Sequence, residues 1–150
     1  MGSFQEREPA FSPDGRWIAY HSNEGGGDNE SFVSPFPGPG GKWQVSTGGG
    51  EFPMWSRNGR ELFYRGPDSK IMVVSYTADG DTFRPSKPEL WADFQFAAVG
   101  PFDRAVDIHP DGQRFAALKS AETRSETRLD KVTFILNFFE HLRRLAPAAN

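Results

Sequence analysis

The sequence contains no cysteine, no long hydrophobic run and no cluster of basic residues. The absence of cysteine excludes disulfides, thiolate metal ligands and a cysteine nucleophile. The first eight residues lack the apolar core of a secretory signal, and no apolar stretch is long enough to cross a bilayer. We therefore expect a soluble chain without a membrane partner, cytoplasmic as given and periplasmic if it belongs to an exported protein.

The charge balance also argues against one class of partner. The net charge is −3 at pH 7 and the pI is about 5.6. Proteins that bind nucleic acids usually gather Lys and Arg on one surface, where these side chains neutralise phosphates. We expect no nucleic-acid partner.

Glycine, proline and aromatic residues are abundant instead. There are 16 Gly and 12 Pro, and aromatic residues make up 14% of the chain. This composition describes many turns and large side chains to bury, which fits an all-β fold better than packed helices. A chain of 150 residues can bury one sizeable core, so we expect a single domain over residues 1–150.

One pattern occurs three times, in residues 11–20, 55–64 and 108–117. Each copy has an apolar residue, a polar residue, Pro or Arg, then Asp or Asn, Gly and a second apolar run. The Asp and Asn positions are 44 and 53 residues apart, close to the period of about 40 to 50 residues found in β-propeller blades.

The pattern predicts a tight hairpin. Proline presets the first turn position, the Asp or Asn side chain folds back on the backbone, and glycine adopts the left-handed conformation. Arg57 replaces proline in the second copy, so that turn is less preset. The structural turn residues that we predict are Asp14, Gly15, Asn58, Gly59, Asp111 and Gly112.

Two further strands are predicted in each of the first two repeat units. They cover residues 31–36 and 42–46 in the first unit, and 70–76 and about 89–91 in the second. Pro85 and Pro88 mark the last of these as an edge strand. Four strands per unit predict blades over about residues 8–50, 51–98 and 99–137. The third ends in a strand over 131–136, and a short helix over about 138–146 is expected to cover the open end of the propeller.

Residues 11–20 closely resemble the signature of the TolB-like, PD40-type repeats, a WD40-like β-propeller family. Residues 108–112 are a second match, whereas 55–60 depart from the signature at Arg57 and Asn58. Residues 35–44 and 134–139 are similar to the last blades of propellers attached to bacterial serine/threonine kinases. The resemblance covers about residues 8–140 and implies a protein-interaction or ligand-binding platform.

Three blades form half of a six-bladed ring, the kind that the resemblance implies. An open arc leaves the apolar faces of its first and last blades uncovered, which creates an association surface. We expect either a homodimer in which two half-rings close one propeller around a two-fold axis, or a chain whose remaining blades are N-terminal.

Few residues are candidates for catalysis. Asp107 and His109 alternate along one strand and could form a base with its orienting carboxylate, although position 109 is also a turn position. His21 and Ser22 are adjacent in sequence, which does not place them in catalytic geometry. His141 is expected on the solvated face of the C-terminal helix. Four tryptophans, at positions 17, 43, 55 and 91, are expected to pack between blades rather than to stack on carbohydrate.

Asp28, Asn29 and Glu30 form a cluster of oxygen ligands after three glycines, and Ca²⁺ prefers such ligands. They lack the spacing of an EF-hand, so a solvated loop is the simpler interpretation, and we expect no required cofactor. A Ca²⁺-dependent lactonase or esterase with its site on the propeller axis is the alternative function. A structural segment of a kinase-linked or peptidase-linked protein is the second alternative.

Overall fold

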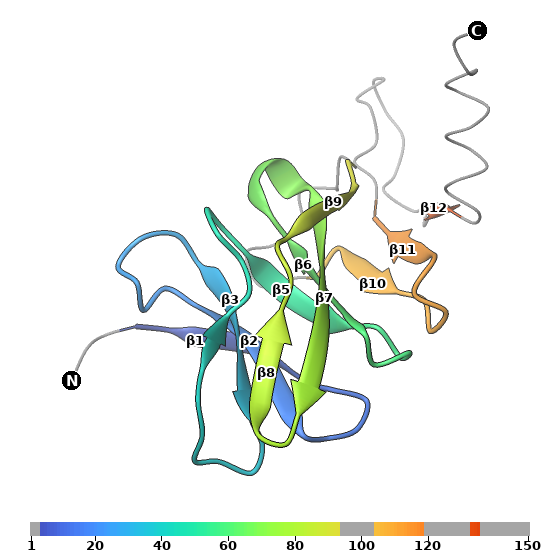
Figure 1. The fold of residues 1–150 in the computed structure, drawn as a ribbon. Coiled ribbons are helices and arrows are strands. Elements are labelled where there is room, and N and C mark those ends of the chain that lie inside the picture. The colour runs from blue at the N-terminus through green and yellow to red at the C-terminus, as the bar shows by residue number, and fades with distance from the viewer. Residues whose placement is uncertain (1–3, 94–103, 119–132, 136–150) are drawn as a thin grey trace, which may run out of the picture. The chain divides into compact units, whose positions relative to one another are not determined.

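The structure is a computed structural model that describes residues 4–93, 104–118 and 133–135. The chain divides into two compact units, residues 1–95 and 96–150. Apart from one short 3-10 turn, η1 (Pro67–Ser69), all regular elements of the described residues are β-strands, which confirms the all-β prediction (Figure 1). The helix expected over 138–146 lies outside the described residues.

The first sheet contains four antiparallel strands in chain order, β1-β2-β3-β4. Its strands are β1 (Glu6–Phe11), β2 (Trp17–Ser22), β3 (Glu30–Pro35) and β4 (Trp43–Gln44). Strands β2 and β3 are central and carry buried apolar residues, among them Trp17, Ala19 and Val33. The outer strand β4 is shorter than the predicted 42–46.

The second sheet has five strands instead of the four expected. They are β5 (Glu51–Trp55), β6 (Glu61–Arg65), β7 (Ile71–Asp79), β8 (Thr82–Pro85) and β9 (Glu89–Ala92). The start of β7 pairs with both β6 and β9, and its distal part, beyond the predicted end at residue 76, pairs with β8. Prolines 85 and 88 separate β8 from β9, and β9 is an edge strand as predicted.

The third sheet belongs to the second unit. It has the order β10-β11-β12, with antiparallel pairing, and three strands are described where four were predicted. These strands are β10 (Val106–Ile108), β11 (Phe115–Ala117) and β12 (Thr133–Ile135).

The same turn connects the first two strands of every sheet. In the first copy, the N–H of Gly15 donates to the carbonyl of Ser12 at 2.9 Å, and the N–H of Ser12 donates to the carbonyl of Trp17 at 2.9 Å. The Asp14 carboxylate accepts a hydrogen bond from the N–H of Arg16 at 3.1 Å. Gly15 has φ = +70°, in the region that only glycine adopts at no steric cost.

The other two turns repeat these bonds. Asn58 accepts from the N–H of Arg60 at 2.9 Å, and Asp111 accepts from the N–H of Gln113 at 2.9 Å. Glycines 59 and 112 have φ of +66° and +68°. With Arg57 in place of proline, the second turn therefore keeps the backbone hydrogen bonds of the first turn and the bond to the Asx side chain.

A cluster of aromatic side chains fills the space between the first and second sheets. Phe83 of β8 lies at its centre and is 1% exposed. Its ring is 5.3 Å from that of Trp17 and 6.1 Å from that of Trp43, both in the first sheet. It is also 4.8 Å from Tyr76 and 6.1 Å from Trp55, both in the second sheet. The β7–β8 hairpin thus extends across the first sheet and joins the two sheets (Figure 1).

The first strand of each of these two sheets contains a β-bulge. Pairing of β1 with β2 shifts register between Arg7 and Ala10, and pairing of β5 with β6 shifts between Glu51 and Met54. Inside each bulge, one residue has a positive φ, +53° at Glu8 and +52° at Phe52, and proline follows it. Glu8 and Phe52 are 44 residues apart, the offset of the turn motif, so the bulge is part of the repeat.

Candidate functional site

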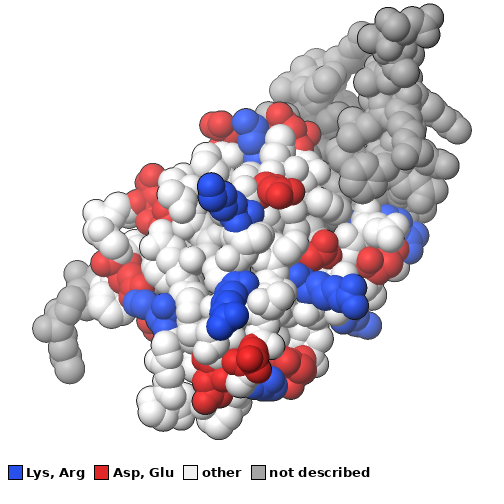
Figure 2. Space-filling model, in the orientation of Figure 1, with Lys and Arg blue, Asp and Glu red and all other residues white. Residues whose placement is uncertain are grey.

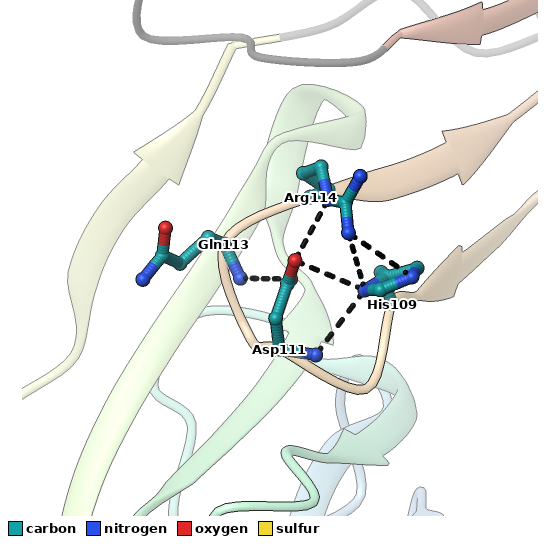
Figure 3. Close-up of polar contacts among 4 residues, drawn as sticks. All are labelled: His109, Asp111, Gln113 and Arg114. Atoms are coloured by element: carbon teal, nitrogen blue, oxygen red, sulfur yellow. Dashed lines mark hydrogen bonds and ion pairs between the residues drawn. The ribbon is translucent and has the colours of Figure 1, made fainter.

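His109 lies in the third repeat turn and contacts Asp111 rather than the predicted Asp107 (Figure 3). Its Nδ1 is 3.1 Å from Oδ2 of Asp111 and 3.2 Å from the N–H of the same residue. The Arg114 guanidinium is 3.2 to 3.3 Å from the two ring nitrogens. The Asp107 carboxylate accepts from the N–H of the next residue, Ile108.

Asp111 is the centre of this turn. Hydrogen bonds from the N–H of Gln113, from Arg114 and from His109 outweigh the small effect of burial and lower the pKa of Asp111 to about 2. Nδ1 of His109 can accept from the N–H of Asp111 or donate to its carboxylate, and the tautomer decides which. Because Asp111, Gln113 and Arg114 all belong to the hairpin, these contacts hold the turn together.

The three oxygen-ligand residues 28–30 are separated by their contacts. Oε1 of Glu30 accepts from the N–H groups of Gly48 and Gly49 at 2.8 and 3.0 Å, and Oε2 accepts from the Ser46 hydroxyl. Asn29 donates to Oε1 of Glu51 at 2.7 Å. Among the described residues, no group of three or more His, Cys, Asp or Glu side chains is arranged to hold a metal ion.

A hollow of about 460 Å³ lies beside this cluster, where the loops of the first and second sheets meet. It is lined by the β2–β3 loop, by the link from β4 to β5 and by the start of the β6–β7 connection. The lining residues are Asn23, Gly27, Asp28, Asn29, Gly48, Gly49, Gly50, Glu51, Arg65, Gly66 and Pro67. We call it the glycine-lined hollow. Five of these residues are glycines, so backbone forms much of its wall.

The charges in the hollow are one ion pair and one additional carboxylate. Arg65 forms an ion pair with Glu51 and lies 4.5 Å above the ring of Phe52. Burial opposes ionisation of Glu51, but hydrogen bonds from Arg65 and Asn29 outweigh it and lower the pKa of this carboxyl. Asp28 is exposed and has no hydrogen-bond or ion-pair partner among the described residues. The hollow therefore carries one excess negative charge.

His21 lies behind this site as a structural residue. It is 3% exposed, and its Nδ1 accepts a hydrogen bond from the N–H of Phe52, in the β5 bulge, at 3.2 Å. Burial, outweighing the nearby Glu51 and Glu8 carboxylates, lowers the pKa of His21 below 6.5. The hydroxyl of Ser22 accepts from the N–H of Glu24. His21 and Ser22 thus have separate structural contacts, and His21 ties the second sheet to the first.

The tryptophans contact other aromatic side chains. Those at positions 17, 43 and 55 belong to the cluster between the sheets, and the ring of Trp91 is 5.0 Å from that of Phe63. The first three therefore pack between neighbouring sheets, as predicted, whereas Trp91 packs within its own sheet. His141 lies outside the described residues.

On the face shown in Figure 2, acidic and basic side chains of the described residues are interspersed, and neither sign forms a continuous patch. No helix among the described residues is long and apolar enough to span a membrane.

Comparison with known proteins found no family model that matches the chain and no similar curated protein. The site must therefore be interpreted from its own geometry. Sequence reasoning singled out Asp28 and Asn29 but missed Glu51 and Arg65, which complete the hollow. The run Gly48-Gly49-Gly50 is a further signal for this place in the sequence, because consecutive glycines are typical of a loop.

Proposed function

We propose that this chain supplies blades of a β-propeller and acts as a module that binds a protein or peptide in the glycine-lined hollow. The repeated hairpins, the two antiparallel sheets in chain order and the aromatic cluster between them support the propeller assignment. The resemblance to TolB-like repeats leads to the same class of function, although fold alone does not identify a partner.

The hollow is the observation that carries the binding proposal. It is concave, lies between neighbouring sheets, and is lined by loops, where binding residues are commonly found. Its glycines let a peptide approach the backbone closely, and Asp28 offers a carboxylate that no described residue neutralises. A peptide with a basic side chain or a free amino terminus fits this charge.

Peptides selected from a random displayed library on the intact chain test the proposal. Gly27 lines the hollow, and a Cβ added there meets no atom within 4 Å, so Gly27→Trp fills the space without strain in the fold. Gly25→Trp is the matched control, because position 25 is equally open but lies outside the hollow. We expect Gly27→Trp to weaken binding at least about tenfold and Gly25→Trp to leave it unchanged.

Asp28→Asn tests the charge. We expect this substitution to weaken the binding of a basic peptide by about two- to fivefold at low salt, the effect of one exposed ion pair. At high salt the loss of affinity should be smaller, because salt screens exposed charges. Asp81→Asn, an equal charge change in the β7–β8 turn, is the control. Selected peptides that bind Gly27→Trp as well as the original chain would refute the hollow as the binding site.

A further inference from the structure

Two aromatic side chains of the first sheet are exposed side by side. Phe11 at the end of β1 is 58% exposed, and Phe36, just after β3, is 47% exposed. Their rings pack edge to face with centroids 5.0 Å apart and an interplanar angle of 77°. We call these two residues the leading pair. An exposed aromatic pair of this kind is typical of an interaction surface.

The second sheet contains the equivalent pair. Trp55 occupies the repeat position of Phe11. Tyr76 occupies that of Phe36, because the residues just before them, Ser75 and Pro35, pair with Glu61 and Trp17, the equivalent first residues of β6 and β2. The N–H of Phe36 donates to the carbonyl of Arg16 at 2.8 Å, and that of Tyr76 donates to the carbonyl of Arg60 at 3.0 Å. The Trp55 and Tyr76 rings also pack edge to face, 5.2 Å apart at 80°.

The two pairs share this edge-to-face geometry, but they differ in what covers them. Nε1 of Trp55 donates to the carbonyl of Ala10 in the first sheet at 2.9 Å. Trp55 and Tyr76 both pack against the core cluster that includes Trp17 of the first sheet. Trp55 and Tyr76 therefore pack against the sheet that precedes them in the chain. Among the described residues, no preceding sheet covers the leading pair in the same way.

We propose that the leading pair is a docking surface for one further four-stranded blade of this repeat, joined to the chain ahead of β1. The observed pair of sheets shows the chemistry of this partner, which is an apolar face that carries a buried tryptophan, as the first sheet does with Trp17. It also shows where this partner lies in the chain, because the first sheet, which covers Trp55 and Tyr76, directly precedes the second sheet, which carries them. This inference rests on the proposed propeller but not on binding at the hollow.

A tandem protein tests the proposal. A second copy of residues 4–50 is placed directly ahead of Arg7 of the chain, because residue 7 is the repeat equivalent of residue 51. Phe36→Cys in the original copy introduces the only thiol, since the chain has no cysteine. The rate of its reaction with a thiol reagent then measures exposure of the docking surface. Asp79→Cys, in an exposed part of β7, is the matched control in the same tandem.

We expect Cys at position 36 to react at least about tenfold more slowly in the tandem than in the single chain, and the control at position 79 to react equally in both. Equal rates at position 36 would overturn the proposal. A second copy of the chain is the competing occupant. It would slow the reaction of the single chain as protein concentration rises, with a dimer in light scattering, and this result would also overturn the proposal.

Failure of this test is distinct from failure of the peptide experiment. The hollow is lined by residues 23, 27–29, 48–51 and 65–67, and neither Phe11 nor Phe36 is among them. Peptide binding can therefore fail while the thiol at position 36 is protected in the tandem. Conversely, the peptide can bind while the thiol stays reactive, so each experiment tests its own proposal.

Discussion

Replacing Phe83 by alanine should strongly destabilise the first unit, and far more than the same truncation at the exposed Phe11. Phe83 is 1% exposed and its ring meets four aromatic rings, two from each sheet. Truncating a buried phenylalanine costs about 3 to 5 kcal/mol, through lost burial and the cavity left behind. A unit of this size has a free energy of unfolding of about 5 to 14 kcal/mol, so the variant loses a large part of its stability.

Urea unfolding monitored by tryptophan fluorescence measures this loss, because three tryptophans lie in the same cluster. With a slope of about 1.5 kcal/mol per molar urea, the midpoint should fall by about 2 to 3 M. Phe83→Leu keeps most of the volume and should lose less than half as much. If alanine lowers the midpoint too far, the leucine variant still gives a measurable transition.

Phe11→Ala is the matched control, since Phe11 is 58% exposed. It removes the same side chain from the surface and should cost less than about 1 kcal/mol. If Phe83→Ala costs no more than Phe11→Ala, then Phe83 does not join the two sheets and the reasoning is wrong.

His21 should make the free energy of unfolding depend on pH, because burial lowers its pKa in the folded state below the 6.5 of the unfolded chain. The stabilisation from neutral His21 is therefore complete above pH 6.5 and is lost as the pH falls below that value. Urea unfolding from pH 7.5 to 5.5 should show this slope, and His21→Ala should flatten it while costing about 1 to 3 kcal/mol through the unpaired N–H of Phe52. An unchanged slope in the variant would assign the pH dependence to other groups. Ser12→Ala should cost about 1 to 2 kcal/mol, because this buried hydroxyl donates to Asp14 and accepts from the N–H of Trp17. Its repeat equivalent Ser56 has a buried hydroxyl without a partner among the described residues, so Ser56→Ala should be neutral or stabilising, and equal losses in the two variants would contradict these contacts.

The hairpins were the most predictable part of the fold, because their conformation depends on local chemistry. An Asx side chain and a glycine at fixed positions specify the turn within a few residues, whatever surrounds it. The strands that flank each turn follow from the short apolar and aromatic runs on either side of it. Even Arg57 in place of proline changed nothing, since proline only presets a φ that other residues also adopt.

Strand β8 could not be predicted, because its stability comes from distant residues. The segment 82–85 is only four residues long, follows a turn and ends in proline, so its sequence predicts a loop rather than a strand. These residues form a strand because Phe83 is buried against Trp17 and Trp43 of the first sheet, which lie 66 and 40 residues earlier in the chain. The extension of β7 to Asp79 was missed for the same reason.

The candidate site was predictable only in part. Asp28 and Asn29 stood out as neighbouring oxygen ligands after three glycines. Glu51 and Arg65 come from other strands, and only the pairing of β5 with β6 places them beside the loop. The sequence analysis paired His109 with Asp107, the carboxylate two residues earlier along the predicted strand. The turn brings the next carboxylate, Asp111, to it instead, since residues two apart on a strand point the same way only until the chain reverses.

The bulges at Glu8 and Phe52 have a consequence for self-association. Strands β1 and β5 are outer strands of their sheets, and a straight outer strand is a template for uncontrolled strand addition and amyloid. Here each strand is kinked at the bulge, and the next residue, proline, has no N–H to donate. The first two repeats thus have a built-in barrier to edge-to-edge polymerisation, while their aromatic faces can still stack.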